Sequence, residues 1–233
     1  MIRKFTRFIF KVCLWSILVP FMVVLIYRWV PVFVTPLMLI RGIENKENGI
    51  LNWEHDWVPL DSISNTIQLA VICSEDQKFM EHDGFDIKAI KEAIEYNKKG
   101  EKIRGASTIS QQTAKNAFLW PGRNWVRKGL ETYFTFLIEL LWSKERILEV
   151  YLNSVEMGKG VYGVEAASEY WFQKNAKSLS LYEAAAIAAV LPNPQVYKAN
   201  PASSYIQKRK LWIVGQIKNY GPLKFPEKSP NKD

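Results

Sequence analysis

Residues 75–86 read EDQKFMEHDGFD, a dense polar stretch directly after residues 63–73, whose apolar side chains recur at helical spacing. If the helix continues through this stretch, Glu75, Phe79 and His82 share one face. A carboxylate at the edge of an apolar helix is partly desolvated, which raises its pKa toward that of a useful general base. A solvated helix end explains the same residues more simply, so this stretch alone does not establish a function.

Helical patterns continue on both sides of this stretch. Apolar side chains at helical spacing are Ile63, Ile67 and Ala70 after Pro59, and Leu130, Phe134, Leu137 and Leu141 on the core face of residues 125–142. Predicted caps are Asp86 before Ile87, Ile90 and Ile94, Ser107 before residues 108–118, and Ser143 before Ile147 and Val150. Ser180 with Glu183 fits a capping box before residues 184–191, and Pro201 starts a helix that ends near Asn219. No convincing strand alternation appears. We therefore expect a mainly α domain over residues 60–221, followed by a disordered tail over 222–233.

The N-terminus predicts a membrane anchor. Residues 8–28 supply about 20 mostly apolar residues, the length that spans a hydrocarbon core. A basic tail over residues 1–11 precedes and overlaps this segment, with Arg3, Lys4, Arg7 and Lys11. Positive charge on this side predicts that the tail is cytoplasmic and that the rest of the chain lies outside. A cleaved signal peptide is the competing interpretation, but Arg28-Trp29-Val30-Pro31 stands where a small-residue cleavage site is expected.

Residues 29–59 form the expected membrane-proximal linker. Within it, residues 30–40 are apolar but too short to span a membrane, and they contain Pro31 and Pro36. This segment fits either an interfacial segment that holds the domain against the lipid or a buried linker.

The composition leaves several partners open. The formal net charge is +8, which suggests an anionic partner such as nucleic acid, acidic lipid or phosphate, or which only aids solubility. Nucleic acid is the weaker choice, because the chain has no zinc-finger spacing, no RNP-like aromatic strand and no long basic run. Cys13 lies in the apolar anchor and Cys73 in a predicted helix, so we expect no disulfide and a buried Cys73.

Three further segments are rich in polar residues. Residues 105–116 read GASTISQQTAKN, and their glycine and hydroxyls precede a helix N-terminus that favours phosphate. On that helix, Ser107, Gln111 and Lys115 would form a polar stripe. Residues 127–131 read RKGLE, whose first and last members are spaced for an ion pair. The glycines of residues 158–163 imply tight turns or a close backbone approach. The first of these segments also fits a plain capped helix with a solvated face, and the second also fits a purely structural ion pair.

Read together, these segments resemble the peptidoglycan glycosyltransferase family, the lysozyme-like domain of bifunctional penicillin-binding proteins and of monofunctional biosynthetic transglycosylases. The matching residues, in order, are Glu75-Asp76, Phe79, His82, Gly84 and Asp86; Gly105, Ser107-Thr108-Ile109, Gln111-Gln112 and Lys115-Asn116; Arg127-Lys128 and Glu131; Ile147-Leu148-Glu149, Tyr151-Leu152-Asn153, Gly163 and Glu165-Ala166-Ala167-Ser168; and Glu183-Ala184-Ala185 with Pro192-Asn193-Pro194. The resemblance covers roughly residues 63–216. An anchor followed at once by this domain looks like the monofunctional type.

The chain departs from the family pattern at three places. Ala106 stands where a second Gly is usual, and Ser110 replaces a common Thr. Gln173 replaces a usual Gly in the run Trp171-Phe172-Gln173-Lys174, where it could alter a turn away from the chemistry.

The resemblance implies an inverting reaction, in which lipid II attacks a glycan carried on polyprenyl pyrophosphate to form a β-1,4 bond. It implies two catalytic carboxylates. Glu75 is the general base, and Glu131 either positions the donor or helps to hold a divalent cation (Mg or Mn); no organic cofactor is expected. A cationic cradle of Lys115, Arg127 and Lys128 would neutralise the pyrophosphate. The remaining expected substrate-binding residues are Asp76, Phe79, His82, Ser107, Thr108, Gln111, Asn116 and Asn153; a structural hydrogen bond is the expected role of His82.

The implied partners are lipid II, the polyprenyl-linked glycan, the cytoplasmic (inner) membrane and cell-wall synthesis proteins, but not nucleic acid. Two alternatives remain. A muramidase or lytic transglycosylase also uses a Glu on a lysozyme-like fold, but it must protonate a sugar leaving group and needs no cationic cluster. A non-catalytic membrane scaffold would keep the fold and would not depend on Glu75.

Overall fold

Helices dominate the computed structural model, which describes residues 2–44, 46, 52–100, 105–122 and 124–226. The α-helices are α1 (Ile2–Ile26), α2 (Pro36–Glu44), α3 (Asn65–Glu75), α4 (Ile87–Lys98), α5 (Ile109–Phe118), α6 (Trp125–Leu141), α7 (Lys144–Ser154), α8 (Val164–Phe172), α9 (Leu181–Val190) and α10 (Ser204–Tyr220), with 3-10 turns at Leu60–Ser62 and Ala176–Ser178. The prediction of a mainly α fold is confirmed.

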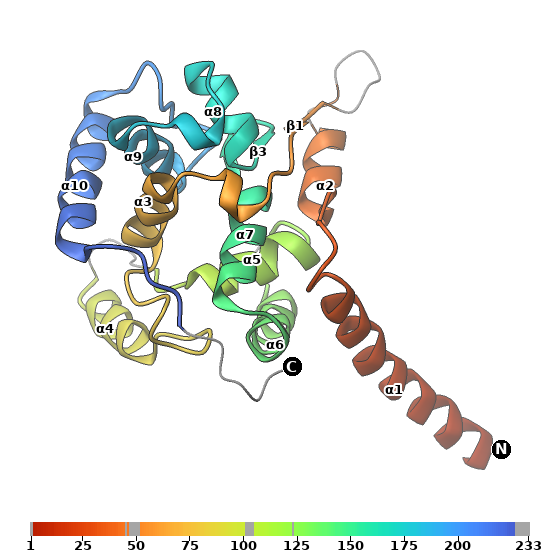
Figure 1. Ribbon diagram of the computed structural model, residues 1–233. Coiled ribbons are helices and arrows are strands. Elements are labelled where there is room, and N and C mark those ends of the chain that lie inside the picture. Colours follow the sequence, from red (N-terminus) through yellow and green to blue (C-terminus); the bar gives the residue numbers. More distant parts are fainter. Residues whose placement is uncertain (1, 45, 47–51, 101–104, 123, 227–233) are drawn as a thin grey trace.

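Two groups of helices build the domain. In one group α9 packs against α3 and α10, and in the other α5 packs against α6 and α7 (Figure 1). Every residue of α9 from Ala184 to Val190 is buried, because its small side chains let neighbouring helices approach on all sides. The C-terminal end of α3 meets α5 through hydrogen bonds of Gln112 with Glu75 and of Ile109 with Asp76, so the first two matched motifs lie where the two groups join.

A small sheet is present, although the sequence showed no convincing strand alternation. It contains β1 (Glu54–His55), β3 (Val161–Tyr162) and β2 (Glu156–Gly158) in that order. β1 is parallel to β3, and β2 is antiparallel to it. Strands of two or three residues are too short to show an alternating pattern, and β1 is paired with β3 by tertiary contacts.

A glycine at the end of β3 allows the close backbone approach that the sequence predicted. Gly163 has φ +81°, and a Cβ at this position would lie 2.9 Å from the carbonyl oxygen of Asn153. A larger residue would be both strained and blocked, so this glycine is required where α7 passes the start of α8.

Side-chain caps begin most helices, and two of them differ from prediction. Asp86, Ser143 and the Ser180–Glu183 capping box are confirmed. For α5 the cap is Thr108 and not Ser107, because Thr108 both accepts from the Gln111 N–H and donates to the Gly84 carbonyl at 2.7 Å.

The last helix also begins later than predicted. Its cap is Ser203, whose hydroxyl accepts from the N–H of Ile206, whereas Pro201 lies outside the helix. Beyond its end, Leu223 and Phe225 pack against the core, so the expected disordered tail begins too early at 222; residues 227–233 lie outside the described part of the chain.

The buried faces of α4 and α6 also differ from prediction. Ile87 and Ile94 are 58% and 51% exposed, and Ala93 is the buried residue of α4. On α6, Leu137 is buried as expected, but the face turned most fully inward carries Arg127, Glu131, Thr135 and Ile138, whereas Leu130, Phe134 and Leu141 are half-buried. The buried face of α6 therefore includes an ion pair, whereas the apolar pattern had predicted that a different face is buried.

The N-terminal helix is long and apolar enough to cross a membrane, which suggests a single-pass anchor. It runs from Ile2 to Ile26, against the predicted 8–28, and extends away from the domain (Figure 1). Its C-terminal half docks on α6: the Trp142 Nε1–H donates to the Val24 carbonyl at 2.8 Å. The guanidinium of Arg146 then donates to the carbonyls of Tyr27 and Val30 at 2.9 and 2.6 Å.

The apolar segment 30–40 is partly buried and partly exposed. Val32 and Met38 are fully buried, whereas Trp29, just before it, and Phe33 within it are well exposed. Pro36 begins α2, a helix that the sequence did not predict, at the first-turn position where a missing N–H costs nothing. α2 lies beside α5 and so joins the anchor to the catalytic domain.

Candidate active site

Glu75 is the last residue of α3, and the helix ends there instead of continuing. Asp76 leaves helical geometry, with φ −160° and ψ 79°. The prediction that Glu75, Phe79 and His82 share one face is therefore wrong. Phe79 is fully buried in the core, beneath the Lys144 ammonium at 4.7 Å, and it does not reach the site.

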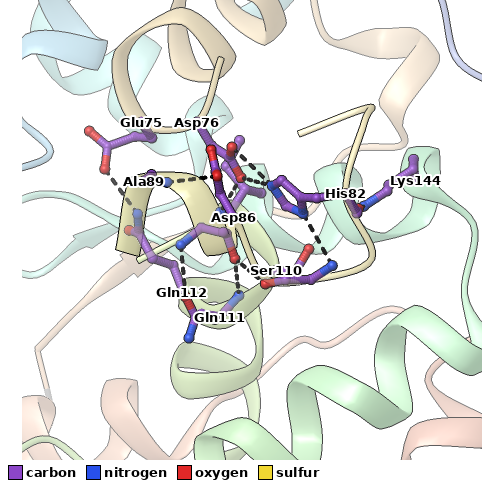
Figure 2. A network of polar contacts seen from close by, with 12 residues as sticks. Glu75, Asp76, His82, Asp86, Ala89, Ser110, Gln111, Gln112 and Lys144 are labelled. Carbon is purple, nitrogen blue, oxygen red and sulfur yellow. Dashed lines mark hydrogen bonds and ion pairs between the residues drawn. The ribbon is translucent and has the colours of Figure 1, made fainter. Parts of the chain in front are cut away.

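The environment of Glu75 suits a general base. Its Oε2 accepts from the Nε2–H of Gln112 at 2.9 Å (Figure 2). Burial raises the pKa of this carboxyl, and the Gln112 hydrogen bond and the charge of Arg209 oppose that shift. A carboxylate that is desolvated but still hydrogen-bonded is more basic than one in water, and it can accept a proton from a sugar hydroxyl.

Asp76 organises the loop that follows Glu75. Its carboxylate accepts from the backbone N–H of Ile109 at 3.0 Å and faces His82 Nε2 at 3.0 Å. The backbone N–H of Gly84 donates to His82 Nδ1 at 3.1 Å, so the ring carries its proton on Nε2 and donates it to Asp76. Both ring nitrogens are used, which agrees with the structural role expected of His82.

Lys144 fixes the same loop to the second helix group (Figure 2). Its ammonium donates to the His82 carbonyl at 2.6 Å and to Glu139 at 2.9 Å. The hydroxyl of Ser110 donates to the same Glu139 oxygen. Ser110 thus keeps the hydroxyl function of the Thr that is usual there.

A cationic cluster lies at the other end of α5. Arg127 Nη1 and Lys128 Nζ contact the two oxygens of Glu131 at 2.8 and 2.5 Å, and Glu131 is only 3% exposed. This confirms the ion pair predicted from spacing. Lys115 is half-buried nearby, and burial lowers its pKa while the charge of Glu131 raises it. Three cations around one carboxylate leave a net positive charge, which suits a pyrophosphate.

Two hollows lie on either side of the hydrogen bond between Gln112 and Glu75. The Glu75 hollow, of about 790 Å³, is lined by Cys73, Ser74, Glu75, Asp76, Gln77, Lys78, Asp86, Lys88, Ala89, Glu92, Gly105, Ala106, Ser107, Thr108, Arg209, Trp212 and Gln216. The Lys115 hollow, of about 450 Å³, is lined by Leu37, Arg41, Gln112, Lys115, Asn116, Leu119, Trp120, Pro121, Gly122, Arg127, Val155, Glu156, Leu191, Pro192, Asn193, Pro194 and Gln195. The Gln112–Glu75 hydrogen bond joins the two, so the carboxylate stands at their junction.

Most of the predicted site residues gather around these hollows. Asp76, Ser107 and Thr108 line the Glu75 hollow, whereas Lys115, Asn116 and Arg127 line the Lys115 hollow. Glu131 pairs with both Arg127 and Lys128, and neither Glu131 nor Lys128 lines the Lys115 hollow itself.

Two predicted binding residues have structural contacts instead. The side-chain oxygen of Gln111 accepts from the Thr108 N–H in the capping box of α5. The Asn153 amide accepts from the Val58 N–H at 3.0 Å and donates to the Val58 carbonyl at 2.9 Å, which fixes the linker to α7. Neither residue lines a hollow, so we assign them to the scaffold.

The structure adds three residues that received no role from the sequence. Gln112 belongs to a matched motif, but the substrate-binding role was predicted for its neighbour Gln111. Tyr151 is fully buried, its hydroxyl donates to the Gln112 side-chain oxygen at 3.3 Å, and burial raises its pKa, which keeps it a donor. Arg209 comes from α10, bonds the Ser74 carbonyl at 3.2 Å and lies over Trp212. No local signal connects Arg209 with Glu75; only the packing of α10 on α3 does.

Comparison with known proteins agrees with this geometry. The transglycosylase family profile matches residues 45–218. Relatives named biosynthetic peptidoglycan transglycosylase occur in Pseudomonas syringae pv. syringae (52% identity over 222 residues; 95% of this chain and 94% of the relative), Haemophilus influenzae (56% over 204; 86% and 83%) and Bacteroides thetaiotaomicron (50% over 226; 97% and 90%). These names describe synthesis, so the lytic interpretation is not favoured. The chain belongs to the transglycosylase family, and it is a glycosyltransferase that polymerises peptidoglycan for the cell wall.

Proposed function

We propose that Glu75 is the general base that activates the acceptor sugar hydroxyl of lipid II, and that the Lys115 hollow receives the pyrophosphate of the donor. The observation that carries this proposal is the position of Glu75 at the junction of a mixed polar hollow and a cationic one. In an inverting displacement the nucleophile and the leaving group act on opposite sides of the reacting carbon, which requires two such spaces.

The residues divide the chemistry between them. Glu75 takes the proton as the acceptor oxygen bonds to the donor's anomeric carbon, while the bond from that carbon to the pyrophosphate oxygen breaks. Gln112 and Tyr151 hold the carboxylate in place, since Tyr151 donates to Gln112 and Gln112 donates to Glu75. Pyrophosphate needs charge neutralisation more than protonation, and Lys115 and Arg127 supply it.

Glu131 has the contacts of a positioning residue. Its two oxygens hold Arg127 and Lys128, so its charge orients cations and does not face a substrate. In the part of the chain that the structure describes, no group of three or more His, Cys, Asp or Glu side chains could hold a metal ion. Both oxygens of Glu131 are already paired with cations, so this donor set does not fit a divalent cation held by the protein.

We further propose that the chain is anchored in the cytoplasmic membrane with its domain outside. Basic residues gather on the N-terminal side of the apolar helix, as expected for a cytoplasmic tail. The contacts of Trp142 and Arg146 with the end of α1 support a retained anchor, because cleavage there would remove their partners. An anchored enzyme also meets its lipid-linked substrates at high local concentration.

The test compares the wild type, Glu75→Gln and Glu81→Gln on purified lipid II. Gln keeps the size of Glu and cannot act as a base. Glu81 is an exposed carboxylate six residues away that lines neither hollow, so it is the matched control. We expect glycan synthesis to be lost in Glu75→Gln alone. Polymerisation at the wild-type rate by Glu75→Gln contradicts the proposal, and release of muropeptides from finished sacculi by the wild type would revive the lytic alternative.

A further inference from the structure

An apolar cavity of about 370 Å³ lies between the anchor helix and the catalytic domain. We call it the anchor niche. Its lining residues come from α1, α2, α5, α6 and the segments that join α1 to α2: Val19, Pro20, Val23, Tyr27, Val34, Thr35, Pro36, Leu39, Ala117, Phe118 and Phe134. None of them is charged, so the anchor niche suits a hydrocarbon ligand.

The anchor niche adjoins the Lys115 hollow across α2. Arg41 of α2 lines the Lys115 hollow, whereas Leu39 lines the niche. On α5, Lys115 lines the hollow and Phe118, one turn further, lines the niche. A cationic site and an apolar site therefore share two helices, as an amphiphile with a charged head and a greasy tail requires.

The niche also lies at the depth of a lipid tail. Val19 stands eight residues before Tyr27, which is about 12 Å along a helix. If α1 spans the membrane, this interval lies within the hydrocarbon region, just below the interfacial Tyr27 and Trp29. A hydrocarbon tail that leaves the Lys115 hollow toward the niche therefore enters the lipid and not water.

Stacked aromatic rings form one wall of the niche. Phe118 stacks on Phe134 with a centroid distance of 4.7 Å, and Tyr27 stacks on Phe118 at 6.0 Å. Tyr27, Phe118 and Phe134 are only half-buried, so their faces remain available to a ligand. Rings packed on each other keep a fixed shape, which is what an ordered binding surface needs.

We propose that the anchor niche binds the first isoprene units of the polyprenyl chain whose pyrophosphate occupies the Lys115 hollow. This inference rests on the proposed function of that hollow. A tail that leaves lipid for protein gains little hydrophobic energy, because lipid tails are as apolar as the niche. The benefit is alignment: a tail held in the niche fixes the pyrophosphate, and with it the anomeric carbon, beside Glu75.

The test uses isoprenyl pyrophosphates of increasing chain length as inhibitors of lipid II polymerisation. Val23→Trp and Leu39→Trp fill the niche from two walls. Val126→Trp is the matched control, since Val126 is 72% exposed on α6 outside the niche. In the wild type and in the control, inhibition should strengthen from inorganic pyrophosphate, which has no tail, to the isoprenyl pyrophosphates. In both niche variants we expect about a tenfold loss of that gain, with inhibition by inorganic pyrophosphate unchanged.

A second measurement does not depend on those variants folding. A polyprenyl pyrophosphate with a photoreactive group on its first units should crosslink the wild type at the peptide that contains Phe118. Equal chain-length dependence in all four proteins, or crosslinking only elsewhere, overturns the inference. Failure of the proposed function gives a different result, because Glu75→Gln would then polymerise lipid II at the wild-type rate.

Discussion

The two ends of α5 carry polar clusters that look alike in sequence and differ in their contacts. At the N-terminal end, the side chains of Asp76, His82, Thr108 and Gln111 all bond to other protein groups. At the C-terminal end, Lys115 forms no ion pair with any carboxylate that the structure describes, and the buried Nε of Arg127 has no hydrogen-bond partner. A satisfied cluster builds the site, whereas a cluster with unused donors can bind an anion.

The largest effect should come from the open cluster. Lys115→Ala removes a cation from the Lys115 hollow, and we expect glycan synthesis to fall by about 10²–10³-fold, the usual loss when one group that stabilises leaving charge is removed. The unfolding midpoint should change little, because a half-buried cation without an ion pair adds little stability.

The control for this prediction is Lys91→Ala, an exposed lysine of α4 that lines neither hollow. Lipid II polymerisation and thermal unfolding are measured on all three proteins. A large loss of stability in Lys115→Ala would mean that this lysine belongs to the scaffold, and it would remove the contrast between the two clusters.

A mutation in the hydrogen-bonded cluster at the N-terminal end of α5 should lower the stability of the fold. Asp76→Ala leaves the Ile109 N–H and the His82 Nε2–H without their acceptor, and we expect the free energy of unfolding to fall by about 2–3 kcal/mol. Asp83→Ala, an exposed change in the same loop, should cost almost nothing. Denaturant unfolding measures both. If Asp76→Ala is as stable as Asp83→Ala, the N-terminal cluster is not structural.

The pH dependence of activity should report both hollows. The base must be ionised, and burial raises the pKa of Glu75, so the rate should rise with pH through a value above that of an ordinary Glu. Burial lowers the pKa of Lys115, so the rate should fall again at a pH below that of an ordinary Lys. Initial rates across pH test this: an acidic limb at the ordinary Glu value would contradict the buried base.

The same shift has a consequence for stability. A carboxyl whose pKa is raised in the folded state contributes stability that is fully present below its unfolded pKa. That contribution is lost as pH rises through the folded pKa. Glu75→Gln carries no charge to bury. The unfolding midpoint of Glu75→Gln minus that of the wild type should therefore be larger at neutral pH than at acidic pH. Thermal unfolding of both proteins at the two pH values measures this difference.

The smallest effect should come from a position remote from both clusters. Gln173 ends α8 in left-handed geometry, with φ 53° and ψ 45°, where the family usually has Gly. Gln173→Gly should stabilise the fold by up to about 1 kcal/mol without altering polymerisation. Gln173→Ala keeps a Cβ and should gain little. Equal stabilities of the Gly and Ala variants would show that the backbone there is not strained.

The sequence predicted most of the helical segments, the caps Asp86, Ser143 and Ser180, and the anchor, because periodicity and capping depend on residues only a few positions apart. It also pointed to Glu75, Lys115, Arg127 and Glu131 through the matched motifs. Strand β1 could not be predicted in this way, since its pairing with β3 joins residues about a hundred positions apart.

The tertiary structure alone decided which polar side chains line the two hollows. A cap one residue later than expected places Gln112, and not Gln111, against Glu75. Neighbouring residues on a helix point about 100° apart, so the rotation of α5 that is set by its packing against α6 and α7 chooses between them. Arg209 reaches the site for the same reason: its helix packs on α3, and no local pattern records that contact.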